Sequence, residues 1–69
     1  MSQTTIDVPG IHCDHCKMSI EGAVGALDGV RSAVVSIPDR TVTVDYDDGA
    51  VDVGAIRGAI EEQGYDVEG

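Results

Sequence analysis

Six short periodic segments follow one another along this 69-residue chain, and their order restricts the fold more than any other feature. Three of them have the side-chain alternation or the β-branched composition of half-buried strands. These three are residues 3–8, 30–37 and 41–46. A shorter alternation over residues 65–68 predicts a last strand. The two segments that remain have helical periodicity.

Two amphipathic helices are predicted, one after the first strand and one after the third. Each begins with a candidate N-cap aspartate and continues with one apolar stripe. The candidate caps are Asp14 and Asp52, and the stripes are Ile20, Val24 and Leu27 in the first helix and Val53, Ile56 and Ile60 in the second. The helices are expected to end at Asp28–Gly29 and at Gln63–Gly64, where glycine suits a left-handed C-terminal position.

The order strand, helix, strand, strand, helix, strand is the split βαβ pattern of ferredoxin-like folds. Pro38, Asp39 and Arg40 supply a turn that makes the second and third strands an antiparallel hairpin. We therefore predict an α+β fold, a ferredoxin-like βαββαβ sandwich with two helices on one face of a four-stranded antiparallel sheet. Residues 1–69 are expected to form a single domain, because a second one does not fit this length.

The charge of the chain disfavours several classes of partner. Thirteen acidic and four basic side chains give a formal net charge of -9, which repels nucleic acid and anionic lipid. Residues 1–5 lack signal-peptide character, and no stretch approaches the roughly 20 apolar residues of a membrane span. We therefore expect a cytoplasmic protein without membrane insertion, in which two close cysteines stay reduced for metal or redox chemistry.

Both cysteines and both histidines of the chain lie in one stretch of seven residues, between Gly10 and Cys16. Cys13 and Cys16 are separated by two residues where a loop meets a helix, so their sulfurs can converge on one exposed point. The first turn of a helix directs unpaired backbone N–H groups towards such sulfurs and favours thiolate. Lys17 adds a nearby positive charge, whereas Asp14 opposes it. This stretch is the candidate functional site.

Several chemistries share the spacing of Cys13 and Cys16. Haem attachment is excluded because Lys17 stands where that motif requires histidine. A closed structural zinc site needs four ligands, and only His12, His15 or Asp14 could complete it locally. Two thiolates without further fixed ligands suit Cu(I). A carrier of zinc or another divalent ion and, in a different class, a small thiol oxidoreductase are the alternatives.

The run from Gly10 to Cys16 resembles the GMxCxxC motif of the heavy-metal-associated domain family, and nearly the whole chain is similar to its free-standing bacterial copper chaperones. The resemblance implies a carrier without substrate turnover, in which Cys13 and Cys16 hold Cu(I). It also implies transfer to a matching CxxC on the metal-binding domain of a copper-transporting P-type ATPase. A copper-responsive regulator is a second candidate recipient. The expected state is a monomer without metal, with a metal-bridged dimer as the alternative when it is loaded.

The same resemblance assigns expectations to the neighbours of the two cysteines. Tyr65 matches an aromatic residue that lies beside the metal without binding it. Ile11 replaces the usual methionine of the motif, and this apolar side chain is expected to pack beneath the loop. Lys17 is a candidate compensator of negative charge, and His15 is a candidate third ligand or a bridge between two protomers. His12 is expected to be a solvated loop residue.

Overall fold

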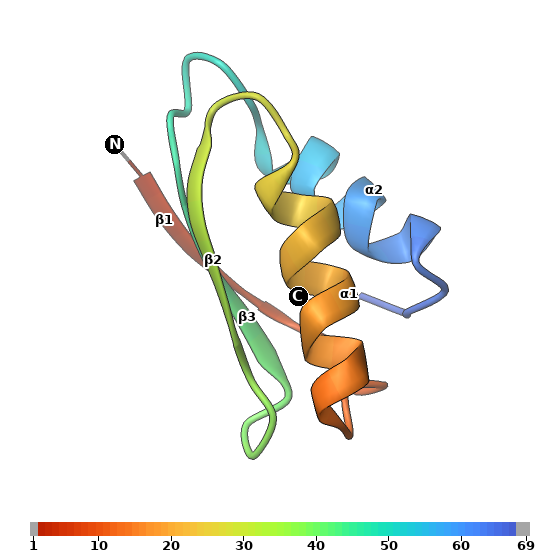
Figure 1. Cartoon of the computed structure of the whole chain (residues 1–69). Helices are drawn as coiled ribbons and strands as arrows, with labels where there is room; N and C mark the ends of the chain where they lie inside the picture. Colours follow the sequence, from red (N-terminus) through yellow and green to blue (C-terminus); the bar gives the residue numbers. More distant parts are fainter. Residues whose placement is uncertain (1, 68–69) are drawn as a thin grey trace.

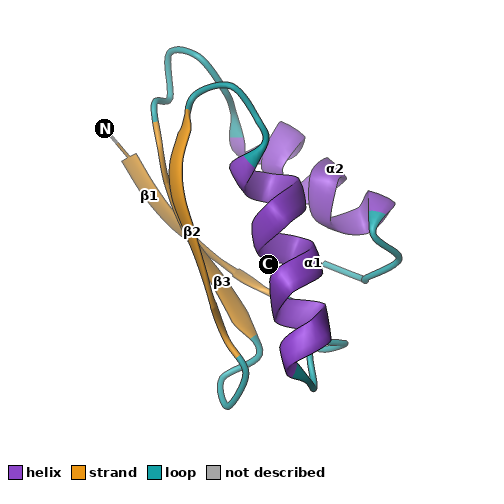
Figure 2. Ribbon diagram, viewed as in Figure 1, coloured by secondary structure: helices purple, strands orange, loops and turns teal. Residues whose placement is uncertain are grey.

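Three antiparallel strands and two helices form two layers in the computed structural model, which describes residues 2–67 (Figure 1). The elements are β1 (Ser2–Asp7), α1 (Asp14–Gly25), β2 (Val30–Ser36), β3 (Thr41–Tyr46) and α2 (Val53–Glu62). The strand order is β1-β3-β2, with antiparallel pairing throughout. Both helices lie on the same face of the sheet (Figure 2). The predicted α+β architecture with two helices on one face is confirmed.

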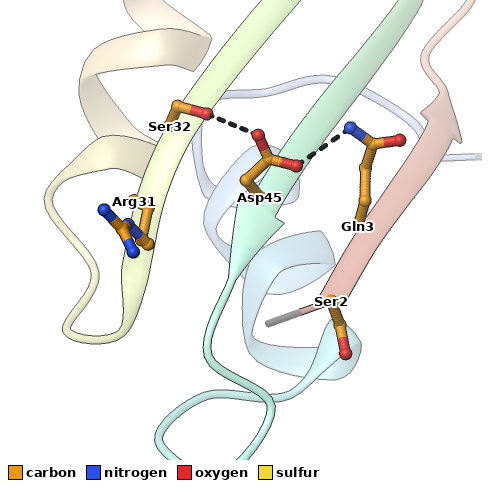
Figure 3. Close-up of a pocket in the computed structure, with 5 residues that line it drawn as sticks. All are labelled: Ser2, Gln3, Arg31, Ser32 and Asp45. Carbon is orange, nitrogen blue, oxygen red and sulfur yellow. Dashed lines mark hydrogen bonds between the residues drawn. The ribbon is translucent and has the colours of Figure 1, made fainter.

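The central strand β3 shows why this sheet has two different faces. Val42, Val44 and Tyr46 are buried against the helices, and the residues between them point to the opposite face. On that opposite face the Asp45 carboxylate joins all three strands (Figure 3). It accepts hydrogen bonds from Gln3 Nε2 at 2.9 Å and from Ser32 Oγ at 3.1 Å. These contacts fix the strand register at the end of the sheet where β1 begins.

The predicted fourth strand is corrected by the structure. Residues 65–67 follow Gly64, whose φ is 93°, and are not part of a strand. Glu68, the last residue of the predicted segment, lies outside the described residues. An alternation over so few residues is a weak signal, and Tyr65 packs towards the loop at Gly10. The sheet of the described residues therefore has three strands, with β1 at one edge.

The limits of α1 also differ from the prediction. Cys13, with φ -154° and ψ 167°, is the N-cap residue, and Asp14 is the first residue of the helix. The Cys13 side chain makes no capping hydrogen bond, so the cap position is set by the path of the loop. The helix ends at Gly25, before the predicted end, and Gly29 adopts its left-handed φ of 94° in the turn that follows.

The predicted start of α2 is confirmed at Asp52. Its Oδ1 accepts a hydrogen bond of 2.8 Å from the backbone N–H of Ala55, as an N-cap side chain does. Ile56 and Ile60 of this helix are fully buried. Gly64 follows the C-cap Gln63 with a positive φ, as expected for a helix C-terminus.

One apolar cluster lies between the two layers and includes residues from every strand and both helices. Its buried members are Ile6, Val8, Ile11, Cys16, Ile20, Val24, Val35, Val42, Val44, Tyr46, Ile56 and Ile60. Two of them, Ile11 and Cys16, belong to the cysteine-bearing stretch, so the core holds that stretch in place. Across residues 2–67, no helix has the length and apolar character needed to cross a bilayer.

Candidate metal centre

A tight turn after β1 positions the loop that carries the cysteines. The Ile11 backbone N–H donates to the Val8 carbonyl at 3.1 Å, and the Val8 N–H donates to the Arg40 carbonyl at 2.9 Å. Ile11 itself has no exposed surface. This burial agrees with the expectation that Ile11 packs beneath the loop. The loop is thus tied both to the core and to the β2–β3 turn.

Cys13 and Cys16 are brought together where this loop enters α1. Their Sγ atoms lie 3.4 Å apart, and both residues are free thiols. Cys13 is exposed, whereas Cys16 lies in the first helical turn and retains only 6% of its surface. The first intrahelical hydrogen bond runs from the Lys17 N–H to the Cys13 carbonyl at 3.2 Å. The pair is therefore one accessible sulfur beside one sheltered sulfur.

The surroundings of Cys16 favour its thiolate form. Interaction with the Tyr65 hydroxyl, followed by interaction with the Cys13 thiol, lowers the Cys16 pKa from 9.0 to about 7. The backbone N–H of His12 and an electrostatic influence of the same residue act in the same direction, and together these influences outweigh burial, which raises the pKa. Near neutral pH a substantial fraction of Cys16 is consequently the nucleophilic, metal-binding species.

Tyr65 lies beside the cysteines, although it follows α2 and is distant in the sequence. A Cβ atom added at Gly10 would lie 3.2 Å from Tyr65 Cδ1, so the ring packs close to the loop backbone. Its interaction with Cys16, burial and the neighbouring sulfur charges raise the pKa of the Tyr65 hydroxyl. The phenol therefore stays protonated and can donate to a thiolate at neutral pH.

The structure brings His12, and not His15, to the two sulfurs. A ring nitrogen of His12 and the Sγ atoms of Cys13 and Cys16 all lie within 4.8 Å of one another. Among the described residues, His15 and Asp14 are not members of this group. His12 Nδ1 also donates to the Gly10 carbonyl at 2.8 Å. His12 is exposed in the loop, as predicted from the sequence, and its position next to Cys13 also brings its ring close to the two sulfurs.

Lys17 is half-buried, and its contact with the site is through the backbone N–H described above. Asp14 and His15 are exposed at the start of α1.

The polar hollow on the opposite face of the sheet is lined by Ser2, Gln3, Arg31, Ser32 and Asp45 (Figure 3). That hollow lies where β1 begins, whereas the cysteines follow the end of β1, so it is not part of the metal centre.

This fold and this pair of thiols define a class of small metal-binding domains. The model of the heavy-metal-associated domain matches residues 5–66, so the chain belongs to the heavy-metal-associated domain family.

Individual relatives are similar over almost their entire length. The chain is 48% identical to the copper chaperone CopZ of Staphylococcus aureus (strain bovine RF122 / ET3-1), across 97% of this chain and 98% of the relative. Among solved structures, a CopZ metallochaperone matches with a TM-score of 0.95 and 46% identity, covering 97% of this chain and all of the other. A copper-binding domain from HMA7, a P-type ATPase, matches with a TM-score of 0.94 and 29% identity, covering 99% and 92% of the two chains. The ferredoxin-like fold is supported by these matches.

Proposed function

We propose that this protein is a cytoplasmic copper chaperone, which binds Cu(I) through Cys13 and Cys16 and passes it on by ligand exchange. The observation that carries the proposal is the pair of reduced sulfurs, 3.4 Å apart at the start of α1. Thiolates are the donors that Cu(I) prefers. The similarity to copper chaperones over nearly the full chain supports the same metal.

The unequal exposure of the two sulfurs fits a carrier. An incoming thiolate from a recipient reaches the metal on the exposed side of Cys13, and a three-coordinate intermediate forms. One original sulfur then leaves, and the remaining bond is exchanged in the same way. The interaction of Tyr65 with Cys16 stabilises a thiolate as metal leaves or enters. The protein acts as a carrier, with no catalytic residues and no substrate turnover.

The recipient in this proposal is the metal-binding domain of a copper-transporting P-type ATPase. Its support is the similarity of the chain to a copper-binding domain of such an ATPase, since donor and acceptor then present the same kind of site. A copper-responsive regulator is a second recipient of the same chemistry.

The protein is a monomer in its metal-free state, because a net charge of -9 opposes self-association.

The first test is a competition titration of the reduced protein with a Cu(I) chelator. The wild type should take the metal from the chelator at a stoichiometry of one ion per chain. A Cys13→Ser, Cys16→Ser double variant should lose at least about a hundredfold in affinity, because no thiolate remains. Equal affinity of the two proteins would refute the proposal.

The order of elements also bears on the redox alternative. Here a helix follows β1 and a β2–β3 hairpin follows that helix, which is the split βαβ order and not that of a larger thioredoxin-like domain. This order supports the carrier. A turnover assay on a disulfide substrate separates the two functions, since the carrier should be inactive in it.

A further inference from the structure

One ring nitrogen of His12 lies within 4.8 Å of both sulfurs of the metal centre. We infer that His12 is a third ligand, and that His12, Cys13 and Cys16 together form a site for a borderline divalent cation of the Zn(II) type. This inference goes beyond the proposed carriage of Cu(I), and it uses the same two cysteines.

The spacing of the donor atoms supports three ligands on one ion. The three atoms lie within 4.8 Å of one another, and the two sulfurs are separated by 3.4 Å. An ion that bonds each sulfur at about 2.3 Å holds them about 3.8 Å apart at a tetrahedral angle and about 4.6 Å apart in a linear arrangement. The observed separation is nearer the tetrahedral value. The two sulfurs therefore need to move less to bind an ion tetrahedrally, with further ligands, than to bind one linearly.

The orientation of the His12 ring is already fixed by a backbone contact. Because the Gly10 carbonyl only accepts, Nδ1 is the donor in the 2.8 Å hydrogen bond between them. In the neutral ring the lone pair is then on Nε2, which can bind metal without loss of that contact. Metal-binding histidines commonly donate their other ring N–H to a carbonyl in this way.

The donor set selects the class of ion. Two thiolates and one imidazole are the set that borderline divalent ions such as Zn(II) and Co(II) accept, whereas Cu(I) is satisfied by the sulfurs alone. Two thiolates also cancel the charge of a divalent ion, so the loaded centre is neutral. A fourth position stays open at the exposed side of Cys13 and His12, where water or a donor from a recipient binds.

The test compares three reduced proteins: the wild type, His12→Gln, and His15→Gln as the matched control. Zn(II) affinity is measured by competition with a chelator, and Co(II) is used as a spectroscopic probe of coordination. The wild type should give the absorption of tetrahedral Co(II) with thiolate ligands. His12→Gln should lose roughly tenfold or more in Zn(II) affinity, and His15→Gln should change it by no more than about twofold.

Two further measurements keep the result independent of Cu(I) carriage. In NMR spectra of the imidazole nitrogens, Zn(II) should shift Nε2 of His12 and leave the His15 ring unchanged. The Cu(I) affinity of His12→Gln is measured beside its Zn(II) affinity and should fall by a smaller factor, because both thiolates are retained. Equal Zn(II) affinity of His12→Gln and wild type, or an unshifted His12 ring, would overturn the inference. Neither result would affect the Cu(I) titration, which tests the proposed function by itself.

Discussion

The Tyr65 hydroxyl interacts with the Cys16 sulfur, and this interaction is the largest of the influences that lower the pKa of that thiol to about 7. Tyr65→Phe removes the hydroxyl and retains the ring that packs on Gly10. The Cys16 pKa should therefore move back towards 9.0, the value of an unperturbed thiol. A pH titration of the thiolate absorbance of the reduced protein measures this change.

Tyr46→Phe is the control for this titration, because it removes the other tyrosine hydroxyl from the buried side of β3. In Tyr46→Phe the midpoint pH of the Cys16 titration should equal that of the wild type. An unchanged Cys16 midpoint in Tyr65→Phe would show that the phenol does not govern the thiol.

The same lowered pKa makes the stability of the metal-free protein depend on pH. Because the folded-state pKa of Cys16 lies near 7 and the unperturbed value is 9.0, the unfolded chain binds more protons between these two values. The free energy of unfolding should rise with pH across that window, and this contribution is lost as pH falls through about 7. Thermal denaturation of the reduced wild type and of Cys16→Ser checks it. The variant should have a flatter dependence; identical slopes would contradict the assignment.

Residues whose environment is local were predictable from the sequence. The alternation of Val42, Val44 and Tyr46 specifies a strand with one buried face, and the structure has that strand. Asp52 caps α2 as predicted, because its carboxylate reaches an N–H only three residues ahead. The pairing of Cys13 and Cys16 likewise follows from a short spacing at a helix start.

Features that depend on the path of the chain in space were not predictable in this way. Aspartate is a more favourable residue type than cysteine at an N-cap, which pointed to Asp14. The burial of Ile11 and the turn at Val8 nevertheless place Cys13 at the cap. The same path of the loop places a ring nitrogen of His12, and not of His15, within 4.8 Å of the two sulfurs. Periodicity contains no information about such side-chain directions, since neither histidine belongs to an apolar stripe.

Glu21 protects the outer edge of β2. Its Oε2 accepts the backbone N–H of Val35 at 3.0 Å, a group that otherwise lies on a sheet edge beneath α1. Glu21→Ala should cost about 1–2 kcal/mol of unfolding free energy, because this N–H loses its partner. Urea denaturation measures the cost, and amide exchange of Val35 localises it. Glu21→Gln retains an acceptor oxygen and should lose less; equal losses in both variants would argue against the hydrogen bond as the cause.

Arg40 occupies a backbone conformation that suits glycine. Its φ is 55°, and its N–H donates to the Ile37 carbonyl at 3.2 Å in the turn between β2 and β3. Arg40→Gly should stabilise the protein by about 0.5–1 kcal/mol, since relief of the left-handed strain exceeds the entropy that glycine adds to the unfolded chain. Asp39→Gly is the control. It loses the hydrogen bond from Ser36 Oγ and should destabilise, so a gain in both variants would exclude backbone strain as the reason.

Ile11 connects the stability of the core with the geometry of the metal loop. Its side chain is fully buried, and its backbone closes the turn that precedes His12. Ile11→Ala should cost about 2–5 kcal/mol, because a cavity remains beneath the loop. The loosened loop should also weaken Cu(I) binding by roughly tenfold, as is usual for residues that orient metal ligands. Ile11→Met conserves volume and should cost less than about 1.5 kcal/mol with affinity retained. Denaturant unfolding and chelator competition on the two variants measure both effects, and wild-type stability of Ile11→Ala would show that Ile11 does not anchor the loop.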